Sequence, residues 1–146
     1  MKTVLFDIDG TLADIKHRRH HVEGDNSHWH AFFEEMGADT VNQPVVDLYN
    51  LLWAHPEYEC IILSGRPDSY RELTEKWFTW NEIPFDRIEM RGAKDNRRDD
   101  VVKLEILDRL RGEGKEIAFV VDDRQQVVDM WRAQGITCFQ CDYGDF

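Results

Sequence analysis

The chain has 146 residues, of which 42% are hydrophobic, and its formal net charge is −11 at pH 7. This length fits one domain with a sizeable core, and the negative charge argues against a broad non-specific nucleic-acid surface, which needs a basic footprint. It still allows a local arginine cluster that recognises one phosphate. The sequence contains no apolar run of roughly 18 residues and no signal-peptide pattern, so we expect no membrane association and a cytoplasmic location. Its three cysteines are too few for a disulfide scaffold.

Apolar runs alternate with amphipathic stretches along the chain. Five runs predict strands, over Thr3–Phe6, Glu59–Leu63, Ile88–Met90, Ile117–Val121 and Ile136–Gln140. Four stretches predict helices, from Pro44 to about His55, from Asp68 to Asn81, from Asp99 to about Arg111 and from Gln125 to Gln134. The alternation is typical of an α/β fold with a doubly wound, parallel, five-stranded, Rossmann-like sheet.

Two finer predictions concern the helix surfaces. In the helix that begins at Pro44, we expect the inner face to consist of Val45, Leu48, Leu51 and Leu52. We also expect three tryptophans to pack in the core or between helices, namely Trp77, Trp80 and Trp131.

The segment from Ala13 to Gln43 differs from the rest of the chain. Asp25-Asn26-Ser27 predicts a helix start, and apolar residues recur at helical spacing from Trp29 to Met36. We therefore expect a small helical cap at about residues 13–43, inserted after the first strand of a single domain that spans residues 1–146. The segment holds five of the six histidines, but their spacing matches no familiar zinc pattern, so we interpret them as polar lining of a cleft. Trp29 could either pack or stack on a nucleobase.

Polar residues follow four of the predicted strands. They are Asp7 and Asp9, Ser64 and Arg66, Arg91, and Asp122 and Asp123. The carboxyl ends of parallel strands meet at one edge of a sheet, and ligands bind there. Asp7 and Asp9 stand two residues apart in an extended segment, so they face the same way and need a cation between them. Oxygen ligands without a nearby cysteine or histidine set favour Mg²⁺.

Two further groups suit an oxyanion at this edge. Ser64-Gly65-Arg66 offers a hydroxyl, a backbone that a ligand can approach closely, and a guanidinium, which together fit a phosphoryl group. Lys103, near the start of a predicted helix, could reach in as a fixed positive charge. Each pattern alone has a simpler interpretation, since Ser-Gly pairs are common in turns and a lone helical lysine is usually solvated.

The order of these residues resembles a known superfamily. Asp7-Ile8-Asp9-Gly10-Thr11, Ser64, Lys103 and Asp122-Asp123 are similar to the four motifs of the haloacid-dehalogenase-like (HAD) phosphohydrolases. The resemblance covers the whole chain. It implies that Asp7 is a nucleophile that forms an aspartyl-phosphate, and that Asp9 is first the general acid and then the base. It also implies that Mg²⁺ is held by Asp7, the Asp9 backbone carbonyl and either Asp122 or Asp123, and that Ser64 and Lys103 bind phosphoryl oxygens.

A second resemblance concerns a family within that superfamily. Arg91-Gly92, Asp99–Lys103, Val121–Arg132 and the ending Gly144-Asp145-Phe146 are similar to the 3′-phosphatase domain of phage polynucleotide kinase/phosphatase. This implies further site residues, which are Arg18, Arg66, Arg91 and Asp99. We expect Thr11 and Gly65 to be substrate-binding as well. No Gly-x-x-x-x-Gly-Lys-[Ser/Thr] loop occurs in the sequence, so we expect no kinase domain and no 5′-kinase activity.

These patterns leave three functions open. The first is a Mg²⁺-dependent phosphomonoesterase that acts on the 3′-phosphate of a nucleic-acid end. The second is a small-molecule phosphatase, such as a 5′(3′)-nucleotidase, with a nucleotide as its substrate. The third is a phosphate-binding module without catalysis, which the presence of Asp7 disfavours.

Overall fold

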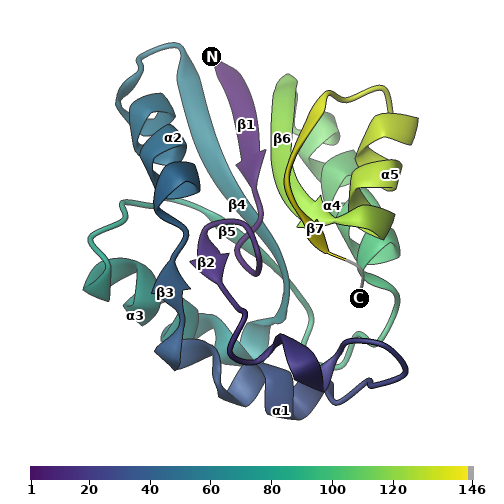
Figure 1. The fold of residues 1–146 in the computed structure, drawn as a ribbon. Coiled ribbons are helices and arrows are strands. Elements are labelled where there is room, and N and C mark those ends of the chain that lie inside the picture. The colour runs from purple at the N-terminus through teal and green to yellow at the C-terminus, as the bar shows by residue number, and fades with distance from the viewer. Residues whose placement is uncertain (145–146) are drawn as a thin grey trace.

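The computed structural model describes residues 1–144, so Asp145 and Phe146 of the motif at the chain end lie outside the described residues. Five parallel strands form the central sheet in the order β5-β4-β1-β6-β7 (Figure 1). The strands are β1 (Lys2–Phe6), β4 (Tyr58–Pro67), β5 (Ile88–Arg91), β6 (Ile117–Arg124) and β7 (Cys138–Gly144). This confirms the predicted α/β class and the five-stranded parallel sheet.

Helices cover both faces of this sheet (Figure 1). They are α2 (Gln43–Ala54), α3 (Arg71–Trp80), α4 (Asp99–Gly112) and α5 (Gln125–Ala133). Successive residues of β1 belong to different cores: Val4 and Phe6 pack with α2 and α3, whereas Leu5 packs with α4 and α5. A strand that is buried on both faces has no polar side to show, and this explains why β1 reads as an unbroken apolar run.

The predicted inner face of α2 is wrong at two positions. Leu48 and Leu51 are 38% and 73% exposed. Tyr49 is buried instead, because its ring packs edge-on against Phe6 with centroids 5.1 Å apart and its hydroxyl donates to the Pro84 carbonyl at 2.6 Å. The large ring and its hydrogen bond fix the rotation of the helix, which a leucine count cannot reveal.

The tryptophan prediction is right for two residues and wrong for Trp80, which is 62% exposed. Trp77 and Trp131 are each 1% exposed, and both indole N–H groups have partners. Trp77 donates to the Asp39 carbonyl at 2.9 Å, and Trp131 donates to Asp122 Oδ2 at 3.1 Å. Trp80 is the last residue of α3, and the buried residues of this helix are Thr74, Trp77 and Phe78.

Several element ends differ from the prediction. β4 and β6 continue to Pro67 and Arg124, so the polar motifs lie in the last residues of the strands themselves. β7 begins at Cys138 rather than Ile136. A 3-10 turn, η3 (Asp68–Tyr70), precedes α3.

The segment between β1 and α2, residues 13–42, is named the flap. It contains β2 (Ala13–Asp14), η1 (Arg19–His21), α1 (Trp29–Glu34), η2 (Met36–Ala38) and β3 (Thr40–Val41). β2 and β3 pair antiparallel in a sheet of their own. In Figure 1, α1 lies below the carboxyl ends of the central strands, opposite the end at which the chain starts. Within residues 1–144, no helix has the length and apolarity needed to cross a membrane.

Candidate active site

Lys103 is the centre of a buried charge cluster at the carboxyl edge of the sheet. Its side chain is 1% exposed, although a lone helical lysine would ordinarily be solvated. Its Nζ donates to Asp7 Oδ1 at 3.0 Å and to Asp122 Oδ2 at 3.2 Å, and lies 3.5 Å from Asp99 Oδ2. Burial lowers the pKa of Lys103, but the charges of Asp122, Asp7 and Asp99 outweigh it and hold the pKa well above its usual range. Lys103 is therefore a fixed cation within this cluster.

Three carboxylates in this region could hold a metal ion. Asp7, Asp122 and Asp123 each offer an oxygen, and these oxygens all lie within 4.8 Å of one another. Burial, followed by the charge of Asp122, raises the pKa of Asp7 well above its usual range and that of Asp123 to about 8. The ammonium of Lys103 does not offset three carboxylates. An all-oxygen donor set with excess negative charge fits a hard divalent cation such as Mg²⁺.

The Asp9 side chain points to a different set of partners. Arg66 Nη2 donates to Asp9 Oδ1 at 2.7 Å, and Arg18 Nη2 donates to the same oxygen at 2.5 Å. Both arginine side chains are 0% exposed. Burial raises the pKa of Asp9, but Arg66 and then Arg18 outweigh it, so that the pKa lies well below its usual range. Of the two aspartates in the first motif, only Asp7 contributes its carboxylate to the metal-competent group, and Asp9 is held ionised by two guanidinium groups.

Sequence reasoning missed Asp39, a flap residue that completes this arrangement. Arg18 donates to it twice, from Nε at 2.8 Å and from Nη2 at 2.6 Å, and Arg66 Nη2 lies 3.6 Å from Asp39 Oδ2. The two arginines therefore face two aspartates, Asp9 and Asp39. Asp39 stands in no motif and on no periodic face, so nothing in the sequence marks it; only its burial beside Arg18 does.

The Ser64-Gly65-Arg66 segment near the end of β4 is braced by residues from β5 and α4. Ser64 is fully buried, and its Oγ accepts from the Arg66 backbone N–H at 3.1 Å. A Cβ at Gly65 would collide with the carboxylate of Asp99, so only glycine allows that approach. Arg91 Nε donates to the Gly65 carbonyl at 2.6 Å, and its Nη2 donates to Asp99 Oδ1 at 3.3 Å. Arg91 and Asp99 thus hold this end of β4 in place from the cavity side.

The first motif makes a tight turn beside the carboxylates. Gly10 adopts φ +81°, and a Cβ there would collide with Asp123. The Thr11 hydroxyl lies 3.4 Å from Asp7 Oδ2 and 3.3 Å from Asp123 Oδ1. Thr11, which we predicted to bind substrate, is 0% exposed and lies against these carboxylates.

The cysteines and the flap histidines lie at the margin of these clusters. Cys138 and Cys141 are both free thiols, and Cys141 Sγ lies 3.7 Å from the Thr11 hydroxyl. The prediction that the histidines line a cleft is only partly right. His30 lines the cavity described next, whereas His17 Nε2 lies 2.6 Å from Asp39 Oδ1 and His21 Nε2 lies 2.9 Å from a glutamate on the flap.

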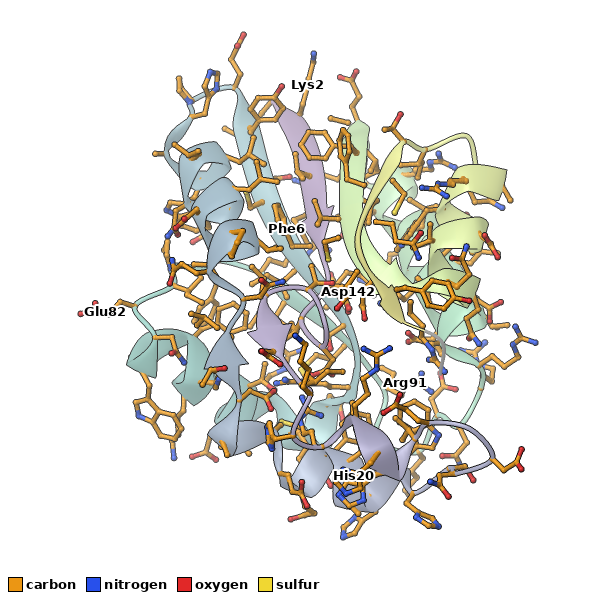
Figure 2. The ribbon with its side chains drawn as sticks, in the orientation of Figure 1. Lys2, Phe6, His20, Glu82, Arg91 and Asp142 are labelled. Atoms are coloured by element: carbon orange, nitrogen blue, oxygen red, sulfur yellow. The ribbon has the colours of Figure 1, made fainter. Side chains whose placement is uncertain are left out.

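A cavity of about 610 Å³ opens onto these groups. Six of the predicted site residues line it, namely Asp7, Asp9, Gly65, Arg91, Asp99 and Asp123. The other six are almost fully buried, at 0 or 1% exposure, and are Thr11, Arg18, Ser64, Arg66, Lys103 and Asp122. In Figure 2, Arg91 lies between the strand ends and the flap residue His20, far from Lys2 at the opposite end of the sheet. The lining residues that sequence reasoning did not single out include Tyr70 and Arg124.

A parallel sheet with aspartates at the ends of β1 and β6, a serine at the end of β4 and a lysine on α4 defines the class of HAD-like phosphohydrolases. Within that class, the sequence model of the polynucleotide kinase PNKP phosphatase domain matches residues 1–146. The chain belongs to this family of HAD-type phosphatase domains.

Solved structures agree with this assignment. The chain is 34% identical to a chain of the Pnkp1/Rnl/Hen1 complex, with a TM-score of 0.84. The match covers 99% of this chain and 46% of that chain. A second structure, of the Pnkp1/Rnl/Hen1 RNA repair complex, gives 35% identity and a TM-score of 0.83. This match covers 99% of this chain and 43% of that chain. The chain thus spans less than half the length of these two relatives.

A HAD family enzyme from Bacteroides thetaiotaomicron, solved in complex with magnesium and inorganic phosphate, shares the fold. Its TM-score is 0.54 at 16% identity, with 100% of this chain and 96% of that chain covered.

Proposed function

We propose that this chain is a Mg²⁺-dependent phosphomonoesterase that removes the 3′-phosphate from polynucleotide ends through an aspartyl-phosphate. The observation that carries the proposal is the position of Asp7. Its carboxylate lines the cavity, its Oδ1 accepts from buried Lys103 at 3.0 Å, and it lies within the oxygen triad that could hold a metal ion. When bound there, Mg²⁺ supplies the positive charge that lets a carboxylate meet a phosphate dianion.

The residues present can perform both halves of the reaction. An Asp7 oxygen attacks phosphorus, the bond from phosphorus to the 3′-oxygen breaks, and Asp9 gives its proton to that oxygen. Asp9 then takes a proton from water, the water oxygen attacks phosphorus, and the bond to Asp7 breaks. Lys103 holds positive charge beside Asp7 throughout.

The acid role of Asp9 needs a proton that Arg18 and Arg66 oppose in this structure. A phosphate dianion that enters beside Asp9 raises the pKa of its carboxyl group, because nearby negative charge favours the neutral form.

The polynucleotide substrate is supported by family and by shape. The family is that of a polynucleotide kinase phosphatase domain, and two similar chains belong to Pnkp1/Rnl/Hen1 complexes, one of them described as an RNA repair complex. We propose that the chain is one phosphatase domain, that the flap is its cap, and that the short cap leaves the cavity open to a polymer end. A nucleotide would also fit a cavity of about 610 Å³, so a nucleotidase is the second candidate.

The test is phosphate release from a short 3′-phosphorylated oligonucleotide, with the matching 3′-mononucleotide as competitor substrate. We expect a higher kcat/KM on the oligonucleotide, dependence on Mg²⁺, and an activity loss of about 10⁴-fold or more in Asp7→Asn. Asp108→Asn, at an exposed position of α4, is the matched control and keeps the parent activity. Hydrolysis of the mononucleotide alone would favour the nucleotidase, and no release from either substrate would leave a non-catalytic phosphate-binding module.

A further inference from the structure

Three aromatic side chains form a row along one side of the cavity. Trp29 and Phe33 come from α1, and Tyr70 comes from η3. The ring centroids of Trp29 and Phe33 are 6.0 Å apart with planes inclined by 31°, and those of Phe33 and Tyr70 are 5.6 Å apart with planes inclined by 38°. These three residues, which join the flap to the segment after β4, are named the aromatic wall.

Packing of the flap explains only part of the aromatic wall, because Trp29 and Phe33 pack against the core and still remain partly exposed. Phe32, which lies beside these two rings, is 1% exposed. Trp29, Phe33 and Tyr70 are only partly buried, and all three line the cavity. Several large aromatic side chains gathered on one exposed surface are the usual mark of a binding site rather than of a core.

Arginines line the same cavity. Arg91 ends β5, Arg97 and Arg98 come from the segment after it, and Arg124 follows the metal-competent carboxylates. The Arg124 guanidinium carbon lies 5.2 Å from the centroid of the Trp29 ring. Each of these arginines is ion-paired with a nearby carboxylate, and five aspartates line the same cavity. The cavity thus places guanidinium groups, held by carboxylates, beside aromatic rings. That combination fits single-stranded nucleic acid, whose phosphates meet guanidinium groups while its bases stack on aromatic faces.

We propose that the aromatic wall holds the terminal nucleobase of a single-stranded nucleic-acid end whose 3′-phosphate lies at Asp7; this rests on the proposed function. The cavity is of the size that takes a whole ligand of nucleotide dimensions rather than a phosphate alone. Every base has a flat π-face, so the aromatic wall accepts any base and gives little sequence preference.

The experiment compares two 3′-phosphorylated oligonucleotides that differ only in the terminal residue, one with its base and one abasic. The readout is the ratio of their kcat/KM values. We expect the full chain to prefer the base-bearing end by about tenfold. In Tyr70→Ala and in Trp29→Leu this ratio falls toward one through a higher KM on the base-bearing substrate. Tyr70→Phe keeps the ring and the ratio, as does Trp80→Ala, whose side chain is 62% exposed at the end of α3.

Two results would overturn the proposal. One is a parent ratio near one. The other is an equal loss on both substrates in the aromatic-wall variants, which would make the wall a support for the flap alone. Fluorescence anisotropy of the two oligonucleotides with Asp7→Asn separates this proposal from the proposed function. Equal binding with and without the base refutes the aromatic wall, whereas absence of phosphate release from every substrate refutes the phosphatase.

Discussion

The two charge clusters of the candidate site differ in their balance. In the sheet-edge cluster, three carboxylates (Asp7, Asp122 and Asp123) face the single ammonium of Lys103. In the flap cluster, Arg18 and Arg66 face Asp9 and Asp39, two charges of each sign. The first cluster has excess negative charge, which a divalent cation would offset, and the second is neutral. The charge balance of the sheet edge therefore suits a metal ion, whereas that of the flap cluster does not require one.

The largest effect is expected at the centre of the sheet-edge cluster. Lys103→Met removes the buried cation and leaves carboxylates without a counter-charge, so we expect a loss of about 3–5 kcal/mol in the free energy of unfolding. Urea denaturation measures it. Lys76→Met, at an exposed lysine that pairs with Glu72 on α3, should change the free energy of unfolding by no more than about 0.5 kcal/mol. A small change in the free energy of unfolding of Lys103→Met would show that water or protonation already compensates the carboxylates, so that the cluster carries no excess negative charge.

Asp39→Asn unbalances the flap cluster in the opposite direction. We expect it to lower the free energy of unfolding by about 2–3 kcal/mol, less than full loss of an ion pair, because asparagine still accepts from Arg18 and Arg18 keeps Asp9. A guanidinium that shifts relative to Asp9 should also lower kcat/KM by about 100-fold.

The thermal stabilisation that Mg²⁺ produces tests whether the two clusters are independent in this variant. The rise in Tm that Mg²⁺ produces should be the same in Asp39→Asn as in the parent, because Asp39 belongs to the neutral cluster. A loss of that rise would mean that the two clusters act as one.

The sequence predicted the sheet-edge cluster well and the flap cluster poorly, for a physical reason. Asp7, Asp122 and Asp123 follow apolar runs, and parallel topology brings such strand ends together whatever the rest of the chain does. Asp39 meets Arg18 because the two ends of the flap come together where β2 pairs with β3, and no local pattern encodes that contact. The same holds for the rotation of α2, where a hydrogen bond from Tyr49 outweighs the leucine pattern.

Two glycines let the backbone approach carboxylates of the site closely, Gly10 at Asp123 and Gly65 at Asp99. The variant Gly65→Ala tests the second of these approaches. The added Cβ would collide with the Asp99 carboxylate, so we expect a cost of about 1–3 kcal/mol together with lower activity. Gly112→Ala is the matched control, since a Cβ at this last residue of α4 meets nothing within 4 Å. It should be neutral or slightly stabilising. If urea denaturation gave the same free energy of unfolding for the two variants, the tight fit of Asp99 against Gly65 would be contradicted.

The smallest expected effect is that of Asp123→Asn, which should stabilise the protein. Asp123→Asn keeps the size of the side chain and an acceptor for Thr11 but removes one of three mutually repelling carboxylates. In metal-free protein we therefore expect Tm to rise by about 2–4 °C, which corresponds to about 1 kcal/mol in a chain of this length. The same variant should gain less from added Mg²⁺ than the parent, because it offers one fewer carboxylate ligand. Asp108→Asn should change neither quantity. A metal-free Asp123→Asn protein that melts below the parent would contradict excess charge at the sheet edge, and with it the reason that this edge, rather than the flap cluster, needs a cation.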